Sequence, residues 1–169
     1  IKLTQKILGL SNDQVKVSYI IGANNHFCEM LYRKSYTDNQ FDLFDTLEEE
    51  LEKPLKLFVE LIFFYNSFNS FNNQITRLDV PYVLKKVFSG YQDLEQNIKA
   101  DYRSCTGFLC PYKKNCSYFN SMQEAKEAKV LIGNHALLFH LPRVLKWPSH
   151  IVIDESHKLE SEVTSAFSL

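Results

Sequence analysis

The sequence predicts an α/β fold with a parallel sheet, and three short apolar segments support this prediction. Residues 15–21 alternate and then run apolar, which favours a strand, and residues 130–133 and 151–153 are apolar runs typical of buried strands. Segments with helical periodicity separate these runs along the chain. Strands that alternate with helices form parallel sheets, and apolar strands of this kind are usually covered on both faces.

The expected helices follow from periodicity and from local start and stop signals. The helix over 44–66 contains Pro54, which would kink it. The helical region over 80–100 is interrupted at Ser89-Gly90, and Ser121 with Glu124 forms a capping box that would start a helix. The remaining expectations are a helix end at 3–10, a polar turn at 23–28, an Asn- and Ser-rich loop at 65–74, a helix opening at 134–140 and a helix from Glu155 onward.

Size and composition exclude several classes of protein. The chain has 169 residues, is 45% hydrophobic and carries a formal net charge of -1, so its overall charge does not indicate a nucleic-acid binder. The sequence has no run of about 20 apolar residues, so it predicts no membrane span. It also has no leader with a basic and then an apolar segment, so it does not predict secretion. Four cysteines without a leader are typical of metal ligands or buried thiols. We therefore expect a reducing, cytoplasmic location.

The four cysteines form one pattern along the chain: Cys28 stands alone, and Cys105, Cys110 and Cys116 follow within twelve residues. Four thiolates hold either an iron–sulfur cluster or a structural zinc ion. Zinc sites more often use paired Cys-x2-Cys ligands, which this chain lacks. Two metal-free alternatives also remain: four buried thiols, or an interaction domain that uses the acidic run at 42–60.

Basic and aromatic residues alternate around the three clustered cysteines. Lysines and arginines there bind nucleic-acid phosphates if they are exposed, and the rings stack under bases. The alternative is that the rings pack around the metal while the lysines are only solvated. The residues predicted to contact nucleic acid are Arg103, Tyr112, Lys113 and Lys114.

Two carboxylates follow the apolar run at 151–153. At the carboxyl end of a parallel strand, Asp154 would coordinate the magnesium of a nucleotide and Glu155 would orient the attacking water. His157 lies close enough in sequence to sense the nucleotide. Acidic residues also cap helices, so this pair is a weak signal alone. The sequence contains no Gly-x4-Gly-Lys-Ser/Thr phosphate loop, so we do not expect these 169 residues to hydrolyse ATP alone.

The cysteines and the Asp-Glu pair, in this order, resemble the XPD/DinG family of iron–sulfur superfamily 2 DNA helicases, and the DinG branch most closely. Two further segments are similar to motifs of that family, the glycine-to-cysteine stretch at 22–28 and the Asn-His-Ala-Leu stretch at 128–138. The segment 154–157 resembles its Asp-Glu-x-His box, and residues 3–8 resemble the tail of its motif Ia. The chain departs from the family where Ala23 replaces an arginine and His26 a tyrosine.

The resemblance implies a RecA-like parallel-sheet motor domain with an inserted, mainly helical iron–sulfur domain. It divides the chain into a motor segment at 1–22, a cluster domain at 23–120 and a second motor segment at 121–169, which carries the Walker B box. The four cysteines would bind a 4Fe–4S cluster, and Asp154, Glu155 and His157 would act on Mg-ATP.

The same resemblance implies the activity and partners of a full-length protein. That protein would be a monomeric ATP-dependent 5′–3′ DNA helicase of DNA repair that acts on single-stranded or forked DNA, without membrane association. The alternative function is a non-enzymatic, zinc-stabilised nucleic-acid-binding module.

Overall fold

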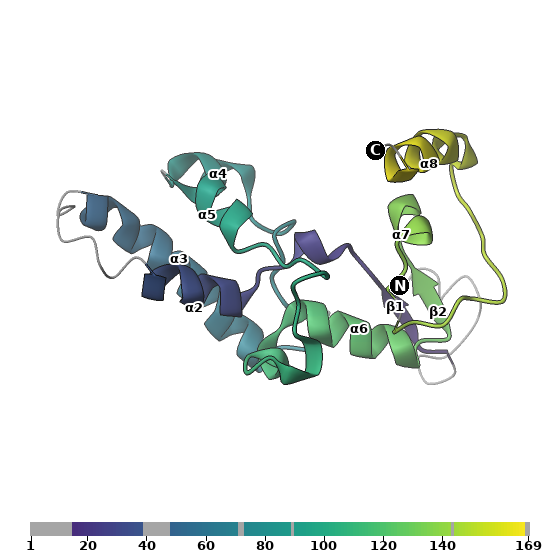
Figure 1. Ribbon diagram of the computed structural model, residues 1–169, viewed down its shortest axis with the longest axis horizontal. Helices are drawn as coiled ribbons and strands as arrows, with labels where there is room; N and C mark the ends of the chain where they lie inside the picture. Colours follow the sequence, from purple (N-terminus) through teal and green to yellow (C-terminus); the bar gives the residue numbers. More distant parts are fainter. Residues whose placement is uncertain (1–14, 39–47, 71–72, 89, 143, 168–169) are drawn as a thin grey trace. The chain divides into compact units, whose positions relative to one another are not determined.

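The computed structural model describes residues 15–38, 48–70, 73–88, 90–142 and 144–167, and it divides into two compact units (Figure 1). Residues Ile1–Gly22 and Ser121–Leu169 form the first, here called the terminal unit. Residues Ala23–Asn120 form the second, the inserted unit. The expected helix end at 3–10 lies outside the described residues. No helix in the described ranges is long and apolar enough to cross a membrane.

The terminal unit contains the predicted parallel pairing of strands. Strand β1 (Val17–Tyr19) pairs with β2 (Val130–Ile132), so that Val17 lies opposite Val130 and Tyr19 opposite Ile132. The Ile20 amide extends the ladder by donating to the Ile132 carbonyl over 2.8 Å. The chain is therefore a mixed α/β structure, mostly helical, with a two-stranded parallel sheet in its described part.

Further helices of the terminal unit follow β2. Helix α7 (His135–Phe139) confirms the predicted opening at Asn134, which is its N-cap. A 3-10 turn, η5 (Ser156–Lys158), leads into α8 (Leu159–Phe167). Helix α8 packs against α7 through the rings of Phe139 and Phe167, whose centroids are 6.2 Å apart.

The predicted burial of two strands is wrong. Leu131 and Ile132 of β2 are 38% and 40% exposed, and Ile151–Ile153 form no strand, with Val152 97% exposed. In the described part of the chain the sheet consists of β1 and β2, and neither strand pairs with residues 151–153. A strand pattern cannot become a strand without such a neighbour.

The predicted capping box at Ser121 is also wrong. Helix α6 (Ser117–Glu127) begins four residues earlier, and Ser121 is fully buried inside it. The side chain of Ser117 lies 2.9 Å from Nδ1 of the buried His26, which holds the first turn of the helix in place. This distant contact outweighs the local capping signal.

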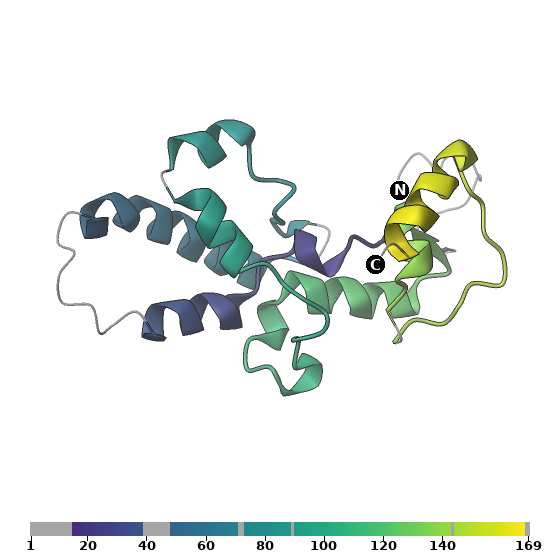
Figure 2. The same ribbon diagram turned by 45° about the horizontal axis from the view of Figure 1, so that its top comes forward.

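The inserted unit is mainly helical, as predicted (Figure 2). Helix α3 spans Glu48–Phe68 with Pro54 inside it, so the single long helix is confirmed but the loop expected from residue 65 begins only after Phe68. The predicted interruption near Gly90 is confirmed, since Gly90 has φ 76° and separates α4 from α5. The other elements are η1 (Ala23–Asn25), α2 (Glu29–Asp38), α4 (Tyr82–Val87), α5 (Tyr91–Asn97), η3 (Gly107–Leu109) and η4 (Lys113–Asn115).

One face of α3 forms the centre of the core of the inserted unit. Leu55, Val59, Ile62 and Phe63 recur at helical spacing on this face and are buried. Each fully buried apolar side chain contributes about 1.5–3 kcal/mol relative to an exposed one. The other buried members of this core are Phe27, Tyr32, Val80, Tyr91 and Ile98.

A buried ion-pair network joins the segment before α4 to α5. Glu95 is 8% exposed and pairs with Arg77 over 3.2 Å and with Lys85 over 3.1 Å, and the Tyr91 hydroxyl donates to it. Burial opposes ionisation of Glu95, but hydrogen bonds from Arg77 and Lys85 outweigh this and lower its pKa. The Arg77 amide also donates to the carbonyl of Asn25, so the network connects α5 with η1.

We predict that Glu95→Gln lowers the free energy of unfolding by about 1–3 kcal/mol at pH 7, because Arg77 and Lys85 lose their carboxylate. The pKa of Glu95 is lower in the folded state than its ordinary value of about 4.5. The stabilisation is therefore complete above that value and disappears as the pH falls through the lowered one.

Urea unfolding of the wild type and of Glu95→Gln between pH 7 and about pH 3, followed by circular dichroism, measures the difference in their free energies of unfolding. Asp93→Asn, a charge removal on the exposed side of the same helix, is the control. Equal stability of wild type and Glu95→Gln at pH 7 would contradict the assignment.

Candidate functional site

A short backbone pairing brings Cys28 to the segment with the other cysteines. Phe27 and Lys99 form an antiparallel bridge. The Cys28 amide donates to the Ile98 carbonyl over 2.7 Å, and the Ala100 amide donates to the His26 carbonyl over 2.9 Å. These bonds place Cys28 at the start of the loop over 101–116, although about seventy residues separate them in sequence.

Tight turns position the three clustered cysteines. The Cys105 amide donates to the Asp101 carbonyl over 3.0 Å, which closes the first turn. Cys110 ends η3 and Cys116 ends η4, so each of these 3-10 turns finishes at a cysteine. Gly107 has φ 55°, a conformation that glycine adopts without strain. The loop is therefore a series of turns that present one thiol each.

All four cysteines line one cavity. This cavity has a volume of about 30 Å³, more than the roughly 10–15 Å³ needed by one water molecule. Its other walls include Leu31, Ala100 and Phe119, which make them partly apolar. All four thiols are free, without disulfides.

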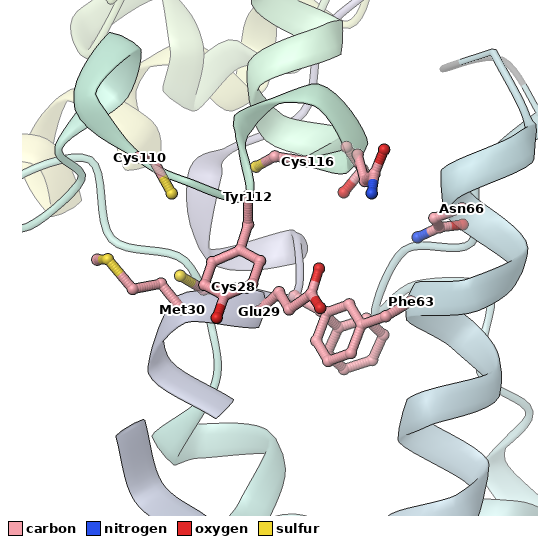
Figure 3. A pocket seen from close by; sticks show the side chains of 11 residues that line it. Cys28, Glu29, Met30, Phe63, Asn66, Cys110, Tyr112 and Cys116 are labelled. Carbon is pink, nitrogen blue, oxygen red and sulfur yellow. The ribbon is translucent and has the colours of Figure 1, made fainter. Parts of the chain in front are cut away.

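A second cavity lies against three of these thiols, those of Cys28, Cys110 and Cys116. Figure 3 shows the side chains of Cys110 and Cys116 directed toward the region of Cys28, with Tyr112 beside them. Phe63 reaches this cavity from α3. Cys28, Cys110 and Cys116 are therefore partly buried between two small cavities, whereas Cys105 lines the first cavity and is exposed.

Burial favours the protonated form of two of these thiols, those of Cys28 and Cys116. It raises the pKa of Cys28, and it raises the pKa of Cys116 to about 11, with smaller contributions from the neighbouring thiols. The pKa of Tyr118 rises to about 12, through burial and then through the nearby Cys105. A metal centre held by these groups would have to displace thiol protons when it forms.

The thiols do not converge on a single point. Among the residues that the structure describes, no three His, Cys, Asp or Glu side chains are grouped so as to hold one metal ion. The four cysteines instead surround a shared cavity, Cys28 from just before α2 and the other three from the loop over 101–116. Four cysteine thiols are the donor set of either an iron–sulfur cluster or a structural zinc ion.

The residues predicted to bind nucleic acid have different surroundings. Arg103 is exposed and its Nε donates to the Tyr102 hydroxyl over 3.1 Å, while Lys114 is exposed. Lys113 donates from Nζ to the Phe108 carbonyl over 2.7 Å and lies 5.9 Å from the centre of that ring. Tyr112 lines the second cavity and faces the thiols.

Within the cysteine loop, the rings of Tyr102 and Phe108 are more exposed than that of Tyr112, with exposed fractions of 58% and 62%. Both belong to the interleaved basic and aromatic segment, but the sequence offered no reason to prefer them to Tyr112. Tyr112 differs from these two residues because it is partly buried beside the cysteines. This burial depends on how the loop turns.

The Asp-Glu pair lies in the terminal unit. Asp154 and Glu155 are both exposed, and the Glu155 amide donates to Oδ1 of Asp154 over 2.8 Å. The carboxylate of Glu155 pairs with Lys158, and His157 is exposed in η5. The Asp154 carbonyl lies 2.8 Å from Nε2 of His135, a contact that the sequence did not indicate.

Comparison with known proteins finds partial similarity to helicases. No protein-family model matches the chain. It is 33% identical over 82 residues to the ATP-dependent DNA helicase DinG of Salmonella typhimurium strain LT2, which is 46% of this chain and 12% of that protein. It is 32% identical over 82 residues, with the same coverage, to the ATP-dependent DNA helicase DinG of Escherichia coli strain K12. The matched part spans about an eighth of these relatives and identifies a helicase-related region in the chain.

Proposed function

We propose that this chain is part of an ATP-dependent 5′–3′ DNA helicase, with a 4Fe–4S cluster in the inserted unit and the Walker B carboxylates in the terminal unit. The observation that carries the proposal is the cavity lined by Cys28 together with Cys105, Cys110 and Cys116. The partial similarity to DinG helicases supports the same function.

The four cysteines fit a 4Fe–4S cluster by the chemistry of their donor set. Such a cluster takes four thiolates, one for each iron, so its ligands need not meet at one point. Cys28 would hold it from the start of α2, and the three other cysteines would hold it from the loop over 101–116. When bound, the cluster would supply covalent cross-links between these segments, and so stiffness rather than electron transfer for catalysis.

The terminal unit has features expected of part of a RecA-like motor domain. Its two strands are parallel, and a sheet of two strands is marginal by itself. Leu131, Ile132 and the run 151–153 expose apolar side chains that further strands and helices of a longer protein would cover. This uncovered surface supports a fold that is completed by other parts of the polypeptide.

In that motor the two exposed carboxylates would act on Mg-ATP. Asp154 would bind the magnesium ion, Glu155 would orient the attacking water, and His157 would sense the nucleotide. A phosphate loop, which these 169 residues lack, would complete the site.

Single-stranded DNA would contact the cysteine loop. Arg103, Lys113 and Lys114 would neutralise phosphates, and the exposed rings of Tyr102 and Phe108 would stack with bases. Tyr112 lines the cavity beside the thiols, so its ring would pack against the cluster and support the loop that contacts DNA.

Metal analysis tests the cluster. Protein purified without oxygen should be brown and contain about four irons per chain. Cys105→Ser should lose most of this iron, while Ser104→Ala, at the preceding exposed position, should keep it. A colourless protein with one zinc would refute the cluster and favour a zinc-stabilised nucleic-acid-binding module.

Substitution of Glu155 tests the motor. In the full-length protein, Glu155→Gln should lower kcat for DNA-stimulated ATP hydrolysis roughly 10²- to 10⁴-fold, with little change in KM, because the attacking water loses its base. Glu160→Gln, on the exposed first turn of α8, is the matched control. Wild-type turnover by Glu155→Gln would exclude the proposed catalytic role.

Salt dependence of DNA binding tests the cysteine loop. Lys114→Ala should weaken single-stranded DNA binding uniformly across sequences and reduce the slope of log K against log salt by about 1. Lys86→Ala, an exposed lysine on α4, should leave the slope unchanged. If both variants behave alike, the loop does not form the DNA contact.

A further inference from the structure

Three consecutive residues after β2, Gly133, Asn134 and His135, have no role in the function proposed above. They follow directly on the end of the strand at Ile132. Each of them makes a different contact in the terminal unit, and the three contacts lead to the Asp-Glu pair.

Gly133 permits close packing where the chain leaves the sheet. A Cβ atom at this position would lie 3.1 Å from Cδ1 of Leu137 and 3.2 Å from Cγ2 of Ile20, tighter than ordinary contacts. The absence of a side chain lets the residue after β1 approach the end of β2. This packing sets the path of the chain into α7.

Asn134 then fixes the start of α7. Its backbone is extended, with φ -82° and ψ 165°, and its Oδ1 accepts a hydrogen bond from the Leu137 amide over 3.2 Å. This is the usual N-cap geometry. His135 is therefore the first residue of a helix whose position is set by both preceding residues.

His135 contacts the backbone of the Asp-Glu pair. Its Nε2 lies 2.8 Å from the carbonyl oxygen of Asp154. A carbonyl oxygen can only accept a hydrogen bond, so Nε2 must carry the proton and donate it. The imidazole thus anchors the peptide group between Asp154 and Glu155 from a separate part of the chain.

The backbone held by this anchor is strained. Glu155 has φ 45° and ψ 47°, and it is the one non-glycine residue with positive φ in the described ranges. Non-glycine residues keep such a conformation only where surrounding contacts enforce it, and they concentrate at functional sites. The turn itself supplies the bond from the Lys158 amide to the Glu155 carbonyl, over 2.9 Å. His135 supplies the bond that comes from outside the turn.

We propose that His135 is a positioning residue for ATP hydrolysis, which holds the main chain of Asp154 so that the carboxylates of Asp154 and Glu155 keep a fixed direction. The inference rests on the proposed helicase function. Both carboxylates are exposed, so packing does not orient them. The Glu155 amide and Lys158 hold the carboxylates within the turn, and His135 ties the turn itself to α7. His135 itself contacts neither nucleotide nor water in this role.

The test compares two variants of the full-length protein whose new side chains at position 135 have equal length. His135→Gln keeps an N–H that can donate to the Asp154 carbonyl, whereas His135→Glu offers only acceptors at neutral pH. We expect His135→Glu and His135→Ala to lower kcat of DNA-stimulated ATP hydrolysis roughly 10- to 100-fold, with KM for ATP changed less than about threefold. His135→Gln should recover most of the lost turnover.

Controls separate this inference from the proposed function. His140→Ala, an exposed histidine just after α7, should turn over like wild type. If wild type hydrolyses ATP and Glu155→Gln does not, the proposed function stands. Equal turnover of His135→Gln and His135→Glu, or wild-type turnover by His135→Ala, then overturns the positioning role alone. A wild-type protein without ATPase activity overturns both. Unchanged iron content and thermal unfolding show that each variant is folded.

Discussion

The inserted unit depends on the short antiparallel contact between residues 26–28 and 98–100. Its hydrogen bonds join Cys28, just before α2, to the end of α5. They bury Phe27 and Ile98 in the same core and place one thiol beside the loop that carries three more. Ordering the long segment between them costs conformational entropy, which the α3 core offsets by burying apolar surface. Without this contact the four cysteines would belong to unrelated parts of the chain.

Further polar contacts support this closure. The pair formed by His26 and Ser117 joins the turn before Cys28 to the first turn of α6, which follows Cys116. The Arg77–Glu95 ion pair, with the backbone bond from Arg77 to Asn25, connects α5 to η1. Buried polar groups of this kind are stable only when each has its partner. They therefore favour the arrangement of the segments around the thiols in which these bonds are made.

In the terminal unit, hydrogen bonds rather than core packing position the Asp-Glu pair. Its sheet is short and its apolar run at 151–153 is exposed, so little packing orients the residues that follow. Direction at the Asp-Glu pair comes from hydrogen bonds: the cap at Asn134, the anchor at His135 and the strained turn at Glu155. A turn held in this way responds to small backbone changes, which would suit the nucleotide site proposed above.

Local patterns in the sequence determined the type of most elements. Local signals predicted α3 from helical periodicity, the break before α5 from Gly90 and the opening of α7 over 134–140, because these signals depend on residues a few positions apart. Cysteine spacing also indicated a shared thiolate site. Tertiary structure alone decided that Cys28 reaches the loop, that α6 starts at Ser117 and not Ser121, that Tyr112 faces inward, and that His135 touches Asp154. These features depend on contacts between residues far apart in sequence, and only the closure of the intervening chain brings such residues together.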